Sequence, residues 1–420
     1  MPKQYKVRRY SYQWSGQKKQ QWKRRGLFVV GLVVAGAVGW FAFDPVFQLV
    51  TNLPVPSFGG SSVVQPLPEP VAPSSQPLPE SSQPAPEPVP EFTGALPESM
   101  YYLAPAVVEQ PQLLSAELAK IKAAGGTGVV FDLKDSNGII RYASELPLVA
   151  TNLAQPETPF QLETMLETIR AAGLTPVGRI YTFRDPLASG SWATYEGSVK
   201  YMDGQVNWLD KSKADGGKSW LNPNSAVARD YLLGIIEEAA SKGVPCLLLD
   251  GVQFPVGQAL HLASFGGTPD RSQVLADFVA AAVEKTARYH TDICPVVLVS
   301  GAAGINEIPY GATPEKLAAA AGRVLLDVRP EQFGIGVTHE KLTLTSPLLT
   351  PGETVTAAMK AAAATTELPE LELGAMIQCY TATGMDSTAN KPYGDAEQAA
   401  QKQAATEAGA TSIWYYTLAG

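Results

Sequence analysis

Cysteine and histidine are both scarce in this sequence, with three of each among 420 residues. Cys246, Cys294 and Cys379 are widely spaced and lie in apolar runs, which indicates buried free thiols rather than a disulfide framework or a metal site. The histidines also lack the spacing of metal ligands: His261, His290 and His339. We therefore expect no bound metal and no other cofactor.

Two common catalytic motifs are missing as well. No glycine-rich phosphate-binding loop occurs, which argues against a nucleotide site. Ser300, in VSGAAG, lacks both the glycine-serine-glycine pattern of a nucleophile elbow and a convincing histidine partner. The chemistry, if any, should therefore depend on carboxylates.

Acidic residues are absent from residues 1–25, which carry nine Lys or Arg side chains. The uncharged run GLFVVGLVVAGAVGWFAF follows at 26–43 and has the length of a short transmembrane helix. The basic residues before it predict a cytoplasmic N-terminus. A cleaved signal peptide is the alternative, but both segments are long for one and no small-x-small cleavage site follows. We therefore expect a single-pass protein of the cell membrane, with 1–25 as its cytoplasmic tail.

The remainder of the chain is acidic. Beyond the nine basic residues of the tail, the chain contains 23 of its 32 Lys and Arg residues and all 40 acidic residues. Its formal charge there is about −17. Nucleic acid is therefore not an expected partner. The tail itself is expected to fix the topology and to touch anionic lipid.

Proline is concentrated in one stretch, with thirteen between residues 54 and 97 among Ser, Glu, Gln and Val. Such a composition cannot bury a core, so residues 44–96 are predicted to form a disordered, polyproline-like linker with a reach of at most ~120 Å. A docking motif for proline-binding domains is the alternative interpretation.

Residues 97–420 have a globular composition in which short β-rich runs alternate with alanine-rich amphipathic segments. The expected strands are 100–103, 128–133, 175–181, 245–250, 295–300, 323–328, 374–380 and 411–416. The expected helices are 112–124, 160–172, 226–242, 272–290, 314–321, 353–365 and 395–408. Eight strands with seven intervening helices predict an α/β fold of the (β/α)8 TIM-barrel type. An open doubly wound sheet is the alternative.

Functional residues of such barrels lie where strands end. Several charged residues occupy these positions: Asp132, Lys134, Asp135, Arg179, Arg184, Asp185, Asp250, Asp327 and Arg329. Asp135 could instead cap a turn, and Arg179 could be a structural counter-ion. Asp250 directly follows three leucines, where an unsatisfied charge would be costly, so it is the preferred functional residue.

The loop at 182–223 is far longer than an ordinary connection, as functional loops often are. It contains Trp192, Trp208 and Trp220, whose faces would suit stacking on sugar rings at a barrel mouth. Ordinary packing within a self-contained loop is the alternative.

Four segments between 128 and 255 resemble, in order, those of the bacterial "putative glycoside hydrolase domain" family, which is found on secreted and membrane-anchored proteins. They are VVFDLKDSNGIIRYAS, VGRIYTFRDP, KSWLNPNSAVARDYL and LLLDGVQFP. The matching positions are Asp132, Lys134, Asp135, Gly138, Arg179, Phe183, Asp185, Pro186, Trp220, Asn222, Pro223, Arg229, Tyr231, Asp250, Phe254 and Pro255. The second half departs from the family pattern: Gln253 replaces an arginine, and AMIQCY keeps Gln378 but places Cys379 where a carboxylate is usual.

The resemblance implies a (β/α)8 barrel that hydrolyses a cell-envelope or surface polysaccharide, such as a peptidoglycan-like glycan. Glycosidases need two carboxylates. Asp250 is the candidate nucleophile or base, and the acid is expected among Asp135, Asp185 and Asp327. Arg179 would orient a carboxylate. Further substrate contacts are expected from Lys134, Trp192, Trp208, Trp220 and Gln378. The departures leave two alternatives open, a catalytically impaired glycan-binding module and an envelope scaffold.

Overall fold

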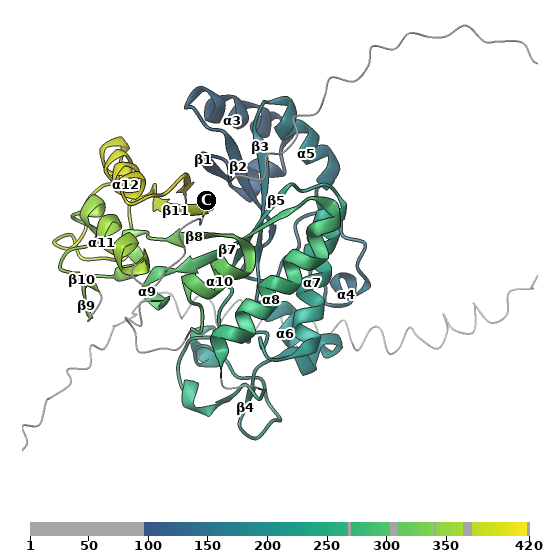
Figure 1. Cartoon of the computed structure of the whole chain (residues 1–420). Helices are drawn as coiled ribbons and strands as arrows, with labels where there is room; N and C mark the ends of the chain where they lie inside the picture. The colour runs from purple at the N-terminus through teal and green to yellow at the C-terminus, as the bar shows by residue number, and fades with distance from the viewer. Residues whose placement is uncertain (1–95, 268–269, 303–309, 340–341, 364–371, 418–420) are drawn as a thin grey trace, which may run out of the picture. The chain divides into compact units, whose positions relative to one another are not determined.

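The computed structural model describes residues 96–267, 270–302, 310–339, 342–363 and 372–417 (Figure 1). The expected cytoplasmic tail (1–25), membrane helix (26–43) and nearly all of the linker lie outside these residues. Among the residues that are described, no helix combines the length and the hydropathy needed to cross a bilayer.

Eight parallel strands form a closed barrel in the order β1-β2-β3-β5-β7-β8-β11-β12. They are β1 (Ser99–Leu103), β2 (Gly128–Lys134), β3 (Thr175–Tyr181), β5 (Cys246–Asp250), β7 (Asp292–Leu298), β8 (Arg323–Asp327), β11 (Glu372–Gln378) and β12 (Ser412–Tyr416). The barrel closes where Met100 of β1 pairs with Trp414 of β12. All eight expected strands and the (β/α)8 fold are thereby confirmed, and the open sheet is excluded.

Seven helices surround the barrel, at the places where the sequence predicts them (Figure 1). They are α3 (Pro111–Ala123), α5 (Leu162–Ala171), α7 (Ala226–Ser241), α8 (Arg271–Thr286), α10 (Pro314–Ala321), α11 (Pro351–Ala363) and α12 (Asp395–Glu407). In α5, the buried side chains recur with helical spacing, so one face packs on the barrel: Leu162, Met165, Leu166 and Ile169.

Short elements fill the connections. They are α2 (Pro105–Val108), α4 (Pro147–Thr151), α6 (Pro186–Gly190), α9 (Val299–Ala302), β4 (Lys200–Tyr201), β6 (Ala263–Ser264), β9 (Val337–His339) and β10 (Leu342–Leu344). The 3-10 helices are η1 (Trp192–Gly197), η2 (Lys213–Asp215), η3 (Leu260–Leu262), η4 (Ala287–Tyr289) and η5 (Pro330–Phe333).

The strands are buried on both faces, which explains their almost continuous apolar sequences. In β5, Cys246 and Leu248 belong to the cluster inside the barrel, whereas Leu247 and Leu249 pack in the layer between strands and helices. All three cysteines are free, as expected. Burial raises the pKa of the Cys379 thiol to about 12, so this thiol is an unreactive, protonated one.

Strand register brings the polar strand ends together at one end of the barrel. Asp132 of β2 is paired with Arg179 of β3, and Tyr181 of β3 is paired with Asp250 of β5. Because neighbouring residues of a parallel register point to the same face, these side chains are directed into the barrel mouth.

The long loop after β3 folds as a small unit of its own. Strand β4 pairs with β6, and Val199, Trp208 and Trp220 form a separate apolar cluster beneath them. The indole N–H of Trp208 donates a hydrogen bond to the carbonyl of Ala259 at 3.3 Å. Trp208 and Trp220 therefore form the core of the loop, as the alternative interpretation expected.

This packing predicts a large difference between two tryptophan substitutions. Trp208→Ala should lower the free energy of unfolding by about 3 to 5 kcal/mol, because it opens a cavity in the loop cluster. Trp192 is 83% exposed, so Trp192→Ala should change it by less than about 0.5 kcal/mol. Urea unfolding of the full chain measures both. Equal, small effects would contradict the packing described.

Candidate active site

A cavity of about 240 Å³ opens at the carboxyl ends of the barrel strands. Two carboxylates line it, those of Asp250 and Asp327. The remaining charged and aromatic side chains of its wall are Arg179, Arg184, Arg329, Tyr181 and Tyr416. The cavity therefore has the position and the polar lining expected of a TIM-barrel active site.

Arg179 connects two carboxylates at the base of this cavity. Its guanidinium forms two hydrogen bonds with Asp132, at 2.6 and 3.0 Å, and reaches Asp250 at 3.5 Å. The hydroxyl of Tyr102 donates to the same Asp132 carboxylate at 2.8 Å. Burial opposes the charge of Arg179, but Asp132 and Asp250 more than offset it and its pKa is raised. Arg179 therefore fixes Asp132 and contacts Asp250, and its role in orienting a catalytic carboxylate stays a prediction.

Asp250 is the least neutralised carboxylate of the cavity. It is the last residue of β5, and its side chain is 17% exposed. Burial raises its pKa, and the charge of Asp327 raises it further, while Arg179 and Arg329 oppose the rise. The long contact with Arg179 leaves this carboxyl group able to accept or donate a proton in the cavity.

Asp327 has a different environment on the neighbouring wall. Both of its carboxylate oxygens accept hydrogen bonds from the guanidinium of Arg329, at 2.8 and 2.6 Å. Arg329 also donates to the hydroxyl of Tyr380 at 3.3 Å and lies 4.2 Å from the ring centroid of Tyr416. This bidentate contact fixes the orientation of the Asp327 carboxylate.

Lys134 and Asp185 do not line the cavity. They form an ion pair at 3.0 Å in which both side chains are fully buried, and Lys134 also donates to the carbonyls of Tyr181 and Thr182. The Asp185 carboxylate accepts the backbone N–H of Ala188 and so caps α6. These placements favour structural roles over those of a substrate contact and a catalytic acid.

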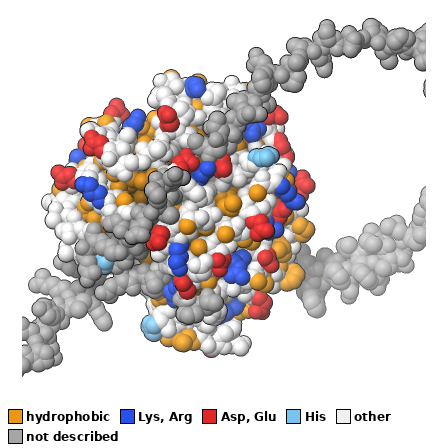
Figure 2. Space-filling view, in the orientation of Figure 1, with side chains coloured by type: hydrophobic (Ala, Val, Ile, Leu, Met, Phe, Trp, Pro, Cys, Tyr) orange, Lys and Arg blue, Asp and Glu red, His pale blue; other side chains and the backbone are white. Residues whose placement is uncertain are grey.

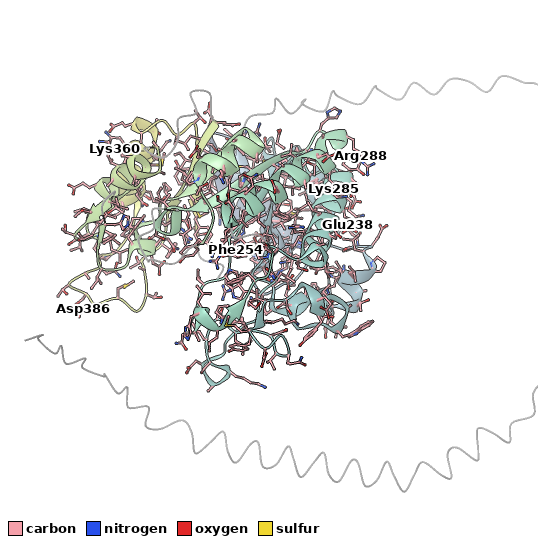
Figure 3. The ribbon with its side chains drawn as sticks, turned by 60° about the horizontal axis from the view of Figure 1, so that its bottom comes forward. Glu238, Phe254, Lys285, Arg288, Lys360 and Asp386 are labelled. Atoms are coloured by element: carbon pink, nitrogen blue, oxygen red, sulfur yellow. The ribbon has the colours of Figure 1, made fainter. Side chains whose placement is uncertain are left out.

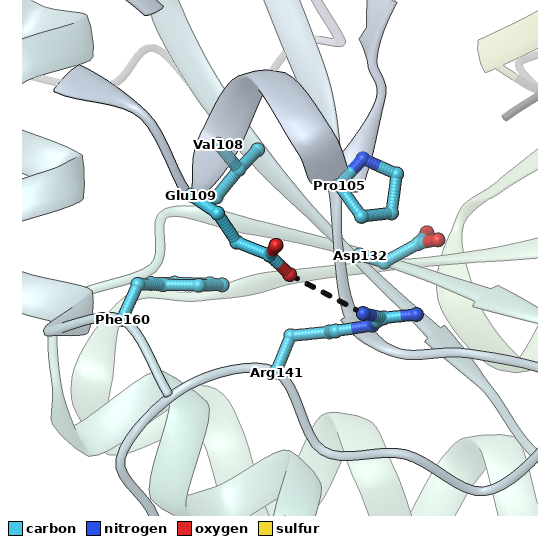
Figure 4. A pocket seen from close by; sticks show the side chains of 6 residues that line it. All are labelled: Pro105, Val108, Glu109, Asp132, Arg141 and Phe160. Carbon is cyan, nitrogen blue, oxygen red and sulfur yellow. Dashed lines mark hydrogen bonds and ion pairs between the residues drawn. The ribbon is translucent and has the colours of Figure 1, made fainter. Parts of the chain in front are cut away.

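Asp135 organises the turn after β2. One carboxylate oxygen accepts the backbone N–H groups of Asn137 and Ile139, at 2.9 and 3.1 Å. The other oxygen is paired with Arg141 at 2.8 Å. Arg141 also pairs with Glu109 at 3.4 Å, and both line a small pocket together with Asp132 (Figure 4). The turn-capping interpretation of Asp135 therefore fits its contacts.

The other expected substrate contacts are also outside the cavity wall. Trp208 and Trp220 are buried in the loop cluster, and Trp192 is exposed at the start of η1. Gln378 is fully buried, where it accepts the N–H of Glu331 at 2.9 Å and donates to the carbonyl of Tyr380.

Several cavity residues were not among the sequence candidates: Ser136, Tyr181, Gln332 and Tyr416. The two tyrosines end β3 and β12, so the strand-end rule could have identified them. Within the described ranges, no group of three or more His, Cys, Asp or Glu side chains is arranged to hold a metal ion.

The fold and the cavity together define a (β/α)8 barrel with paired carboxylates and arginines at its mouth. Residues 100–419 match the model of a protein family described as "Putative glycosyl hydrolase domain", and the chain belongs to this family. The resemblance found in the sequence is thereby confirmed. No curated protein matches the chain.

Two solved structures are similar to parts of this chain. The glycoside hydrolase domain of PgaB (BpsB) from Bordetella bronchiseptica is 12% identical, has a TM-score of 0.52, and is matched over 77% of this chain and 94% of that one. A hypothetical protein from Ruminiclostridium thermocellum is 26% identical with a TM-score of 0.39, over 44% of this chain and 92% of that one. The first similarity supports the barrel fold.

The buried Lys134–Asp185 pair generates a stability prediction. Lys134→Met should lower the free energy of unfolding by about 3 to 5 kcal/mol, because it leaves the Asp185 carboxylate buried without its counter-ion. Lys120 is a matched control, since its side chain is 73% exposed and its ion pair with Glu117 lies on the surface. Urea unfolding should show almost no change for Lys120→Met. A loss below about 1 kcal/mol for Lys134→Met would contradict the structural role.

Proposed function

We propose that the chain hydrolyses a glycosidic bond in this cavity, with Asp250 as the general acid and Asp327 as the second carboxylate. The observation that carries the proposal is the contrast between two carboxyl groups in one cavity. Asp250 is weakly paired and its pKa is raised, whereas Asp327 is held by the fork of Arg329. Glycosidases separate the roles of two carboxyl groups by such differences in environment.

The raised pKa gives Asp250 a different role from the nucleophile or base expected from the sequence. A carboxyl group that keeps its proton can deliver it to the leaving oxygen of the glycosidic bond. Arg179, fixed by Asp132, would hold Asp250 in position during this transfer. Asp327 would stabilise the positive charge of the transition state, activate the attacking water or act as the nucleophile.

The substrate would be a glycan of the cell envelope or cell surface. This part of the proposal is supported by the basic segment 1–25 and the apolar run 26–43, which would anchor the chain in the membrane with the barrel outside. The proline-rich linker would allow a reach of at most ~120 Å, so the target would lie close to the membrane.

Glycan binding without hydrolysis is the second candidate function. It is supported by the arginine pairing of the carboxylates, since both oxygens of Asp132 and both of Asp327 are engaged by guanidinium groups. In that case, saturable binding would occur without release of reducing ends, and Asp250→Asn would leave affinity unchanged.

The acid role of Asp250 predicts a dependence on the leaving group. With a polysaccharide substrate, Asp250→Asn should lower kcat/KM by about 10²- to 10⁴-fold, because the leaving oxygen then receives no proton. Aryl glycosides with acidic phenols need no such proton, so their kcat should be far less affected. Release of sugar and of phenol by the full-length protein in detergent measures both. An equal loss on both substrates would assign Asp250 the role of nucleophile instead.

The same assignment predicts the pH dependence of the reaction. Asp250 must be protonated in the free enzyme, and its pKa is raised above the ordinary value of 3.8. Activity should therefore persist at pH values above 3.8 and fall as the pH rises through the raised pKa. The plot of kcat/KM against pH should lose this upper limb in Asp250→Asn when an activated aryl glycoside is used. An upper limb that survives the substitution would belong to another group.

A further inference from the structure

Three guanidinium groups converge on this one cavity. Arg179, Arg184 and Arg329 all line it, and all three oppose the rise that burial and Asp250 produce in the pKa of Tyr181. Tyr181 lines the same cavity as the three cations. The positive charge is therefore concentrated beside the proposed site of bond cleavage.

Two of these cations are committed to carboxylates. Arg179 forms its bidentate pair with Asp132, and Arg329 forms one with Asp327. Arg184 differs from both, because it has no ion pair or hydrogen bond to a side chain in the part of the chain that the structure describes. It lies in the loop after β3, is half-buried and lines the cavity.

The cavity and its floor contain three arginines and three aspartates, so their formal charges balance only while Asp250 is ionised. Asp132 and Asp327 each engage one arginine through two hydrogen bonds, whereas Asp250 has a single contact of 3.5 Å with Arg179. Whenever Asp250 holds the proton that the proposed reaction requires, Arg184 has no counter-charge. A neutral sugar would not supply one, whereas an anionic group on the substrate would form charge-assisted hydrogen bonds with its five N–H donors.

We propose that the cavity takes a glycan whose sugar beside the scissile bond carries an anionic group, and that Arg184 binds this group. The group would be the carboxylate of a uronate or a phosphate ester, and its recognition rests on the proposed hydrolytic function of the same cavity. Arg184 is then a specificity-determining residue.

The net negative charge of the domain confines the binding of an anion to the cavity. Residues 97–420 contain 23 Lys or Arg and 35 Asp or Glu residues, a formal charge of about −12. On the face shown in Figure 2, basic side chains are interspersed with acidic ones and form no continuous basic surface. A polyanion would therefore be repelled by the domain as a whole and attracted at the cavity, which favours binding of one anionic residue over binding along a surface.

A glycan array tests this inference with the full-length protein carrying Asp250→Asn, which should slow turnover. The array pairs uronate oligosaccharides with their carboxyl-reduced forms, and phosphorylated oligosaccharides with their dephosphorylated forms. We expect at least one anionic member to bind about tenfold or more tightly than its neutral partner, with an affinity that falls as salt is added. The two arms distinguish a carboxylate from a phosphate.

Variants of Arg184 identify the group responsible. Adding Arg184→Gln should abolish the preference for the anionic member, and Arg184→Lys should restore part of it, because lysine keeps the charge but loses the planar fork. Arg288→Gln is the matched control. It removes the same charge from a residue that lies at the outer edge of the molecule, near Lys285, where it pairs with Glu237 (Figure 3). The preference should survive this change.

Three results would overturn the proposal: equal binding of both members of every pair, a preference that persists in Arg184→Gln, and no binding of any anionic glycan. Failure of this proposal can be distinguished from failure of the proposed hydrolysis. If the unsubstituted protein releases reducing ends from a neutral glycan and Asp250→Asn does not, the hydrolytic function stands and the anionic specificity is rejected.

Discussion

The ion pair between Arg179 and Asp132 is the interaction on which the rest of the cavity depends. It lies inside the barrel, where Arg179 is surrounded by the rings of Tyr102, Trp414 and Tyr416 at 5.1 to 5.8 Å from their centroids. Two charges in such a place are costly to remove from water, and only good geometry compensates for that cost. The bidentate contact and the hydroxyl of Tyr102 supply this geometry. The pair also leaves one guanidinium nitrogen directed at Asp250, so the barrel interior determines where the proposed acid lies.

The fold could be predicted from the sequence because its signal is repeated and redundant. The barrel strands are short apolar runs, and the outer helices bury one face against them. Because this pattern recurs along the domain, a wrongly predicted element does not change the predicted fold. The expected bounds differ from the observed ones mostly by one to three residues at the ends. The strand expected at 295–300 begins earlier and extends from Asp292 to Leu298, with Pro295 inside it. Such shifts reflect hydrogen-bond register, which composition does not encode.

The site was less predictable, because position at a strand end does not fix the direction of a side chain. Between Asp132 and Lys134 the register of β2 against β3 is irregular, so that Lys134 is paired with Ile180. Ile180 packs in the layer between strands and helices, and Lys134 is directed there too, where Asp185 neutralises it. A regular strand would have placed Lys134 on the same face as Asp132, beside the cavity. The tryptophans show a related limit, since aromatic side chains in a loop can equally form its core or its exposed face.

Most charged side chains at the barrel mouth are held in close ion pairs. Lys134 and Arg329 each pair with one carboxylate, and Arg179 pairs closely with Asp132 and more distantly with Asp250. Further backbone or hydroxyl contacts fix the three close pairs. Pairs of this kind position the surrounding groups but have little freedom to exchange protons. Of the charged groups that line the cavity, Asp250 has only the 3.5 Å ion pair with Arg179, and Arg184 has no side-chain partner among the described residues. Because a charge that is partly removed from water is costly unless it is compensated, the weak pairing of Asp250 supports its proposed role as the acid, and the lack of a partner for Arg184 supports its proposed role in binding an anion.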